Sequence, residues 1–98
     1  MPKVSLLALH TSPELATEVV AYYLRERILE VSGASAAYLL QDDTEPGRLV
    51  VVAHWDTEDG YTAWQNAPVR ARFTEEIAAI TGGAITASNS ELKVLHQS

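Results

Sequence analysis

The most constraining part of the sequence is the run from residue 49 to residue 80, in which a strand pattern passes directly into a helical one. The block Leu49–Ala53 is apolar and rich in β-branched residues. It is too short for a buried helix, so it predicts a buried strand that continues to about Trp55. Asp56 or Thr57 is expected to cap a helix that follows at once. A strand and a helix joined so closely favour a mixed α and β fold.

A proline divides the helical region in two. Pro68 disfavours helical geometry at the residue before it and suits the first position of a new helix. The new helix is expected to end at Gly82 and Gly83. Its apolar residues recur at helical spacing and form one stripe, made of Val69, Phe73, Ile77 and Ile80.

The rest of the chain supplies the remaining elements. Val4–His10 is apolar on both alternating faces and predicts a strand, and a helix is expected from Ser12 to Gly33. Residues 34–41 and 91–96 are expected to be strands, with a turn at 42–47 that makes a hairpin. The order βαββαβ predicts an α+β, ferredoxin-like fold with an antiparallel-type four-stranded sheet. Right-handed crossovers are expected to make the first and third strands parallel neighbours.

Size and composition limit the function. The 98 residues fit one domain, residues 1–98. A net charge of −6 argues against nucleic acid as a partner, and zero cysteines exclude disulfides and thiolate metal sites. No apolar run is long enough to span a membrane, and the first residues do not form a signal peptide, so we expect a cytoplasmic protein.

The apolar strands also predict a partner. Helices can cover only one face of a four-stranded sheet, yet the first and third predicted strands are apolar on both faces. Burial of the second face by a second copy of the chain would stabilise it through the hydrophobic effect. We therefore expect a homodimer.

Three histidines raise the question of a metal site. His10 and His54 are expected near the ends of parallel neighbouring strands, where they could approach one another, whereas His96 is expected at the opposite edge of the sheet. We therefore predict no metal site. His54 is a candidate general base, because an imidazole beside an apolar cavity can deprotonate a phenol near neutral pH. The simpler interpretation is a histidine that only ends a strand.

The aromatic residues allow two interpretations. They could frame a flat hydrophobic ligand, although their spacing favours a core. A buried tyrosine is ambiguous, because its hydroxyl needs a hydrogen-bond partner in either case. Arg70 and Arg72 are interpreted as solvated surface rather than a carboxylate site. The aromatic residues concerned are Tyr22, Tyr23, Tyr38, Trp55, Tyr61, Trp64 and Phe73.

One set of spacings resembles a known family. Trp55, Tyr61, Trp64, Pro68 and Phe73 are placed as in the antibiotic biosynthesis monooxygenase (ABM) domain family, and the resemblance covers nearly the whole chain. It implies a dimeric α+β barrel, in which two ferredoxin-like sheets pack face to face. It also implies a monooxygenase that needs no cofactor, in which a deprotonated aromatic substrate reacts directly with O₂ in an apolar pocket.

Two positions depart from particular members of that family. The quinone-forming oxygenases carry an asparagine four residues before the first tryptophan, where this chain has Val51. The haem-degrading members carry a histidine ten residues after the second tryptophan, where this chain has Thr74. Without that axial ligand, haem degradation is not expected.

Two functional hypotheses follow. The first is a cofactor-independent monooxygenase that acts on a small phenolic or polycyclic substrate, with His54 or Tyr61 handling the proton. Its pocket is expected between the sheet and the helices of residues 57–80, not inside the dimer barrel. The second is a non-catalytic dimeric module that binds a small hydrophobic ligand or acts in stress response. The pocket residues of the first hypothesis are Trp55, Trp64, Phe73, Tyr23 and Thr74.

Overall fold

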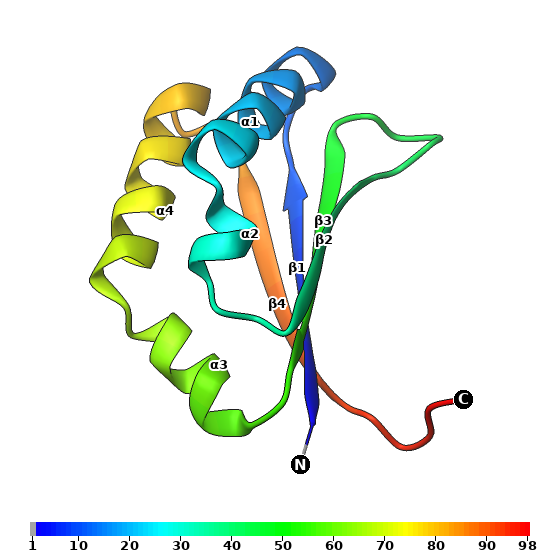
Figure 1. Ribbon diagram of the computed structural model, residues 1–98. Helices are drawn as coiled ribbons and strands as arrows, with labels where there is room; N and C mark the ends of the chain where they lie inside the picture. The colour runs from blue at the N-terminus through cyan, green and yellow to red at the C-terminus, as the bar shows by residue number, and fades with distance from the viewer. Residues whose placement is uncertain (1) are drawn as a thin grey trace.

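The computed structural model describes residues 2–98 and shows a four-stranded sheet with helices on one face (Figure 1). The strands are β1 Lys3–His10, β2 Ala36–Gln41, β3 Arg48–Trp55 and β4 Thr86–Lys93. The helices are α1 Pro13–Glu26, α2 Ile28–Val31, α3 Glu58–Gln65 and α4 Pro68–Thr81. The predicted α+β, ferredoxin-like βαββαβ fold is confirmed.

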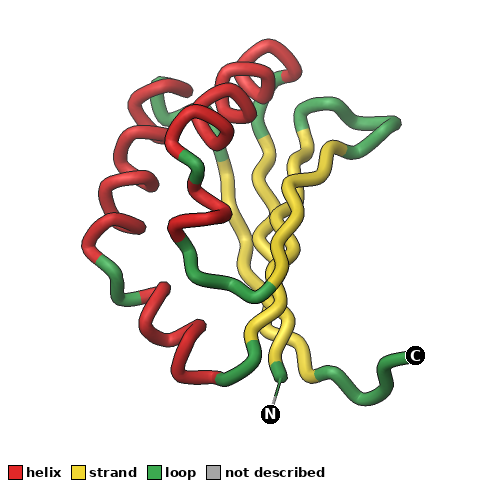
Figure 2. The backbone as a smooth tube through the Cα atoms, in the orientation of Figure 1, coloured by secondary structure: helices red, strands yellow, loops and turns green. Residues whose placement is uncertain are grey.

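The sheet is antiparallel throughout, in the order β2-β3-β1-β4. The prediction that the first and third strands are parallel neighbours is wrong. A right-handed crossover makes β1 and β2 parallel, and the hairpin then returns β3 between them in the opposite direction. Figure 2 shows the helical layer on one side of this twisted sheet and no layer on the other side.

Local signals set the helix ends. The hydroxyl oxygens of Ser12 and Thr57 accept hydrogen bonds from backbone N–H groups three residues further on, at the start of α1 and α3. Pro68 opens α4 as predicted, and Gly82 ends it with a left-handed backbone, φ 61°. No helix in the described part of the chain is long and apolar enough to cross a membrane.

Two boundaries differ from the predictions. The first helix does not continue to residue 33, because Arg27 adopts a left-handed conformation, φ 53°, that separates α1 from the short α2. The last strand covers residues 86–93 rather than 91–96. Lys93 is paired with Lys3, the first residue of β1, so the chain beyond Lys93 has no strand to pair with.

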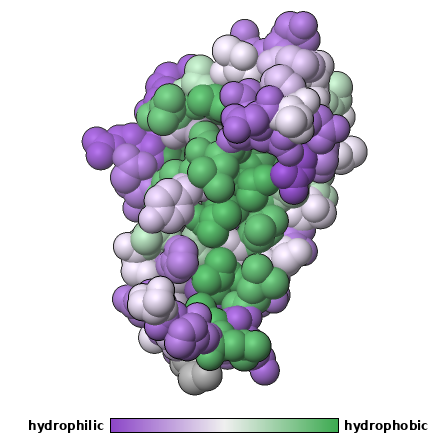
Figure 3. All heavy atoms as spheres, turned by 90° about the vertical axis from the view of Figure 1, so that its right-hand side faces the viewer, coloured by the Kyte–Doolittle hydropathy of each residue, from purple (hydrophilic) through white to green (hydrophobic). Residues whose placement is uncertain are grey.

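The two faces of the sheet have different neighbours. The core lies between the sheet and the helices, and it includes Leu9, Val19, Leu49, Phe73 and Ile77. The second face, which we call the open face, is not covered by any described helix, and Figure 3 shows the apolar patch that it forms. The C-terminal segment reaches one end of it, where Val94 and Gln97 line a hollow with Tyr38 and His54. The strand register assigns these apolar residues to the open face: Val4, Leu6, Ala8, Tyr38, Leu40, Val50, Val52 and Leu92.

Candidate functional site

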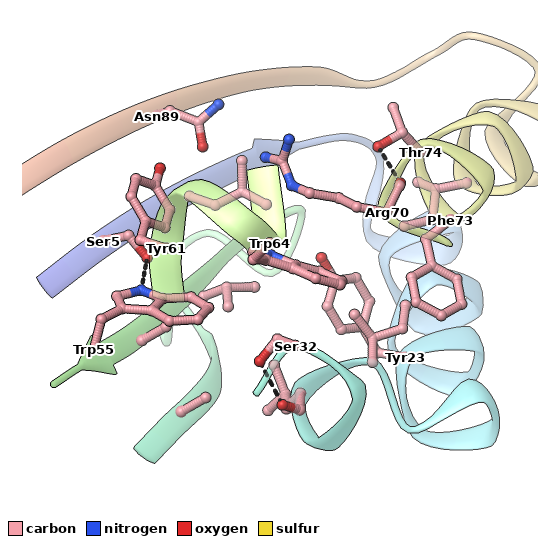
Figure 4. Close-up of a pocket in the computed structure, with 17 residues that line it drawn as sticks. Ser5, Tyr23, Ser32, Trp55, Tyr61, Trp64, Arg70, Phe73, Thr74 and Asn89 are labelled. Atoms are coloured by element: carbon pink, nitrogen blue, oxygen red, sulfur yellow. Dashed lines mark hydrogen bonds between the residues drawn. The ribbon is translucent and has the colours of Figure 1, made fainter. Parts of the chain in front are cut away.

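A cavity of about 80 Å³ lies between the helix-covered face of the sheet and the helices (Figure 4). Every strand and every helix contributes at least one side chain to its wall. Val51 and Ala53 of β3 lie on the sheet side, while Tyr61 and Trp64 of α3 lie on the helix side. The cavity is therefore at the place that the sequence predicted for a pocket.

Aromatic rings make up much of the wall. The ring centroids of Trp55 and Tyr61 are 5.4 Å apart, and those of Trp64 and Phe73 are 6.4 Å apart. The break at Pro68 allows Trp64 and Phe73 to come together, because Trp64 lies in the last turn of α3 and Phe73 belongs to α4. Such rings favour flat, apolar ligands.

Six residues of the predicted site line this cavity. They come from one strand and three helices, and the helix α1 supplies a residue from far earlier in the chain. These residues are Tyr23, Trp55, Tyr61, Trp64, Phe73 and Thr74.

His54 is not among them. Its side chain lies on the open face, where its ring is 6.4 Å from that of Tyr38 in an edge-to-face arrangement. The expectation that His54 lies beside the cavity is wrong, because successive side chains of a strand point to opposite faces. Ala53 and Trp55 line the cavity, so the residue between them faces away from it.

The histidines also do not approach one another as expected. His10 is paired with Arg48, at one end of the β1 and β3 pair, and His54 is paired with Val4, at the other end. This separation follows from the antiparallel direction of the two strands. Among residues 2–98, no three histidine, aspartate or glutamate side chains form a group suited to a metal ion.

The polar groups of the cavity fall into two classes. The first class is bonded within the protein. The hydroxyl of Ser5 accepts a hydrogen bond from Nε1 of Trp55 at 2.9 Å, Ser32 donates to the Leu29 carbonyl, and Thr74 donates to the Arg70 carbonyl. These bonds hold the wall in shape. The Ser5 hydroxyl keeps its own O–H as a donor, whereas Ser32 and Thr74 have used their donors and keep acceptor capacity alone.

The second class has no side-chain hydrogen bond to any residue of the described chain. It consists of Tyr23, Tyr61, Arg70 and Asn89. Burial raises the pKa of Tyr23 to about 12, with Arg70 acting weakly in the other direction, so its hydroxyl stays protonated at neutral pH. The described wall contains no carboxylate and no imidazole. The cavity therefore offers hydrogen-bond donors and one fixed positive charge.

Sequence reasoning missed two of these polar residues. Arg70 is half-buried at the cavity rather than solvated, and it lies on the same face of α4 as Phe73 and Thr74, three and four residues later. That spacing was a usable signal. Asn89 belongs to β4, a strand whose residues are all exposed, so its sequence shows no apolar alternation that could have placed it.

A wider cleft adjoins the cavity. It has a volume of about 390 Å³ and runs between α4 and β4, along Ala78 and Ala87. Tyr23, Arg70 and Asn89 line both spaces. These three residues therefore stand at the boundary between the inner cavity and the outer cleft.

Comparisons with known proteins give the family and the fold. The sequence model of the family described as antibiotic biosynthesis monooxygenase matches residues 5–76. No curated protein matches the chain. Solved structures do match it over nearly their full length.

Three of these structures are informative. A protein from Deinococcus radiodurans that is named as an antibiotic biosynthesis monooxygenase has a TM-score of 0.82 and 15% identity, over 97% of this chain and 94% of that chain. SnoaB, a cofactor-independent oxygenase from Streptomyces nogalater, has a TM-score of 0.66 and 14% identity, over 98% and 93%. A dimeric ferredoxin-like protein from an uncultured marine organism has a TM-score of 0.73 and 10% identity, over 100% of both chains. At these identities the likeness shows a shared fold.

Proposed function

Because this chain belongs to the antibiotic biosynthesis monooxygenase family, we propose that it is a cofactor-independent oxygenase that oxidises a small phenolic or polycyclic aromatic substrate with O₂. The observation that carries this proposal is the cavity walled by Trp55, Tyr61, Trp64 and Phe73. Its wall is made largely of aromatic and aliphatic side chains, and it presents the hydroxyl groups of Tyr23 and Tyr61 to a bound ring. The shared fold with SnoaB supports it.

The chemistry needs no electron source other than the substrate. For an anthrone, the deprotonated ring system transfers electrons to O₂, and a carbon peroxide forms at the reactive CH₂ carbon. Cleavage of the O–O bond leaves one oxygen atom as the new ketone and releases the other as water with the two hydrogens of that carbon. The substrate supplies all four electrons, so the reaction is balanced without a flavin or a metal.

Tyr61 has the clearest role in this scheme. Its side chain is only 3% exposed, and its hydroxyl has no partner within residues 2–98. We assign it to donate a hydrogen bond to the peroxide oxygen as negative charge develops there, which is the kind of contact that lowers a barrier most. Trp55, Trp64 and Phe73 hold the ring. Tyr23 and Thr74 complete the wall.

One observation favours a second candidate function. The described cavity wall has no carboxylate or imidazole that could remove a proton from the substrate. A binding module without catalysis, which holds a small hydrophobic ligand, would need no such base. In the oxygenase proposal, by contrast, the substrate must enter already deprotonated or lose its proton to water.

We also propose that two copies of the chain pack through their open faces as a homodimer. The open face places apolar side chains on all four strands, and Tyr38, Leu40 and Leu92 are each about half exposed. Patches of this kind on a soluble domain usually mark an interface. A solved structure with the same fold is described as dimeric.

The test is oxygen consumption with a panel of hydroquinones and anthrones. We expect turnover by the wild type that a metal chelator does not change. Tyr61→Phe should lower turnover about 10²-fold, as loss of an oxyanion donor does. His54→Ala should leave it within about twofold, because its side chain faces the other side of the sheet. No oxygen uptake with any substrate would favour the binding module, and loss of turnover in His54→Ala would return that histidine to the mechanism.

A further inference from the structure

Arg70 differs from the other cations of the chain. Of the seven lysine and arginine residues, five form ion pairs with glutamate or aspartate. Lys93 is exposed on β4. Within residues 2–98, Arg70 is thus the cation that is half-buried in a cavity wall without a carboxylate partner. No fully buried side-chain nitrogen of the described residues lacks a partner, so solvent still reaches the Arg70 guanidinium, and its N–H donors are available to an anionic ligand.

The surroundings of Arg70 suit one kind of anion. Figure 4 shows the Arg70 side chain extending from α4 over Trp64, toward the region where the Asn89 amide and the Tyr61 hydroxyl also point. A planar guanidinium can bind both oxygens of a carboxylate at once, and an amide N–H₂ can add a further donor. Because Arg70 and Asn89 line both spaces, the anion would lie at the boundary between cavity and cleft.

The size of the two spaces limits the rest of the molecule. The inner cavity of about 80 Å³ is well below the roughly 300 to 1,000 Å³ of pockets for drug-sized ligands. A single aromatic ring therefore suits the inner cavity, and any larger part of a ligand would have to extend into the cleft of about 390 Å³. The boundary residues are then placed to meet a charged group attached to that ring.

We propose that the site selects an aromatic carboxylate, with the ring beside Trp64 and the carboxylate bound by Arg70 and Asn89. This inference rests on the proposed function, which gives the cavity an aromatic substrate. It adds that this substrate carries a negatively charged carboxylate. The net charge of −6 repels anions at long range, so the selection must come from this local contact.

Calorimetric titration with a matched pair of probes tests the proposal at pH 7. 4-Hydroxybenzoate carries the carboxylate, and 4-hydroxybenzamide has the same shape without the charge. We expect the wild type to bind the benzoate at least 10-fold more tightly than the amide, which is the scale of a charge-assisted hydrogen bond. Arg70→Gln should abolish this preference by weakening the binding of the benzoate at least 10-fold more than that of the amide.

Two further variants sharpen the test. Arg72→Gln is the matched control, because Arg72 lies on the same helix but already pairs with Glu26 and Glu76; it should keep the full preference. Asn89→Asp places a carboxylate of the protein beside Arg70 and should abolish the preference as Arg70→Gln does. Circular dichroism of each variant checks that it is folded.

Three results would overturn the proposal: no binding of the benzoate to the wild type, equal binding of both probes, or equal weakening of both probes in a folded Arg70→Gln. The oxygenase proposal is tested apart from this one. Carboxylate selectivity without oxygen uptake would keep the anion site and reject the oxygenase. Oxygen uptake with neutral substrates, together with equal binding of the two probes, would keep the oxygenase and reject the anion site.

Discussion

The indole Nε1 of Trp55 donates a hydrogen bond of 2.9 Å to the hydroxyl of Ser5, so the last residue of β3 is fastened to β1. Trp55 is only 3% exposed and lies against the ring of Tyr61. This bond gives the buried indole N–H its partner, and it sets the orientation of the aromatic wall from the sheet side.

Ser5→Ala should lower the stability of the fold measurably. The substitution leaves a buried N–H without a partner, which costs about 1 to 3 kcal/mol. For a domain of this size that corresponds to a fall in Tm of roughly 4 °C or more. Thermal denaturation followed by circular dichroism measures it. In a Trp55→Phe background the same substitution should cost much less, and equal costs in both backgrounds would show that the bond contributes nothing.

Tyr23→Phe should reduce the loss of stability at alkaline pH. Burial raises the pKa of Tyr23 from 10.0 to about 12 in the folded chain. Between these values the unfolded chain binds fewer protons at this residue than the folded chain does, so the free energy of unfolding falls as the pH rises. At about 1.4 kcal/mol per pKa unit, the two-unit shift corresponds to at most about 3 kcal/mol, of which about half is lost by pH 11.

Urea denaturation from pH 8 to pH 11 measures this effect. Tyr22 contributes in the same direction, because burial and then its hydrogen bond to Glu76 raise its pKa to about 12. Lys3 contributes in the same direction too, because its hydrogen bond to Glu91 raises its pKa. Tyr23→Phe should therefore make the alkaline decline shallower without abolishing it, and should leave stability at pH 8 nearly unchanged. A decline as steep as that of the wild type would contradict the assignment.

Leu40→Lys should dissociate the proposed dimer without unfolding the chain. Leu40 is 47% exposed in the single chain, so a lysine there can reach water, but in a dimer through the open face its charge would be buried at a cost of several kcal/mol. Sedimentation velocity at micromolar concentration should find a dimer for the wild type and a monomer for Leu40→Lys. Leu24→Lys is the control, since Leu24 is 71% exposed on α1, away from the open face. A monomeric wild type would reject the dimer.

Gly47→Ala should destabilise the loop before β3. The backbone N–H of Thr11 donates to the Gly47 carbonyl at 2.9 Å, and a Cβ at Gly47 would overlap the Thr11 carbonyl. The backbone at Gly47 or at Thr11 must then shift, which should lower the free energy of unfolding by about 1 to 3 kcal/mol. Gly60→Ala is the comparison, because a Cβ at Gly60 meets only ordinary contacts in α3 and should be neutral or stabilising. Chemical denaturation should give a lower free energy of unfolding for Gly47→Ala than for the wild type, and an equal or higher one for Gly60→Ala.

The parts of the fold that sequence reasoning predicted depend on short-range interactions. Thr57, Pro68 and Gly82 act on backbone groups within a few residues, so their effects can be read directly from the chain. The break at Arg27 has no such signal. It has neither glycine nor proline beside it, and it turns the chain so that Ile28 enters the core, which is a consequence of tertiary packing.

For the candidate site, the sequence predicted the aromatic residues of the wall but not the positions of His54 and Arg70. The aromatic residues were identified because their spacing matched a family pattern, and they do line the cavity. The position of His54 was missed although the alternation along β3 would have revealed it. For Arg70 the sequence predicts a surface position, because a charge on a helix usually is solvated; the space between α4 and β4, which the sequence does not reveal, makes room for it at the cavity.

β4 pairs with β1 alone and has no buried residue, yet it carries Asn89 into the candidate site. Substitutions along this strand can therefore alter what the protein recognises while the core that stabilises the fold stays intact.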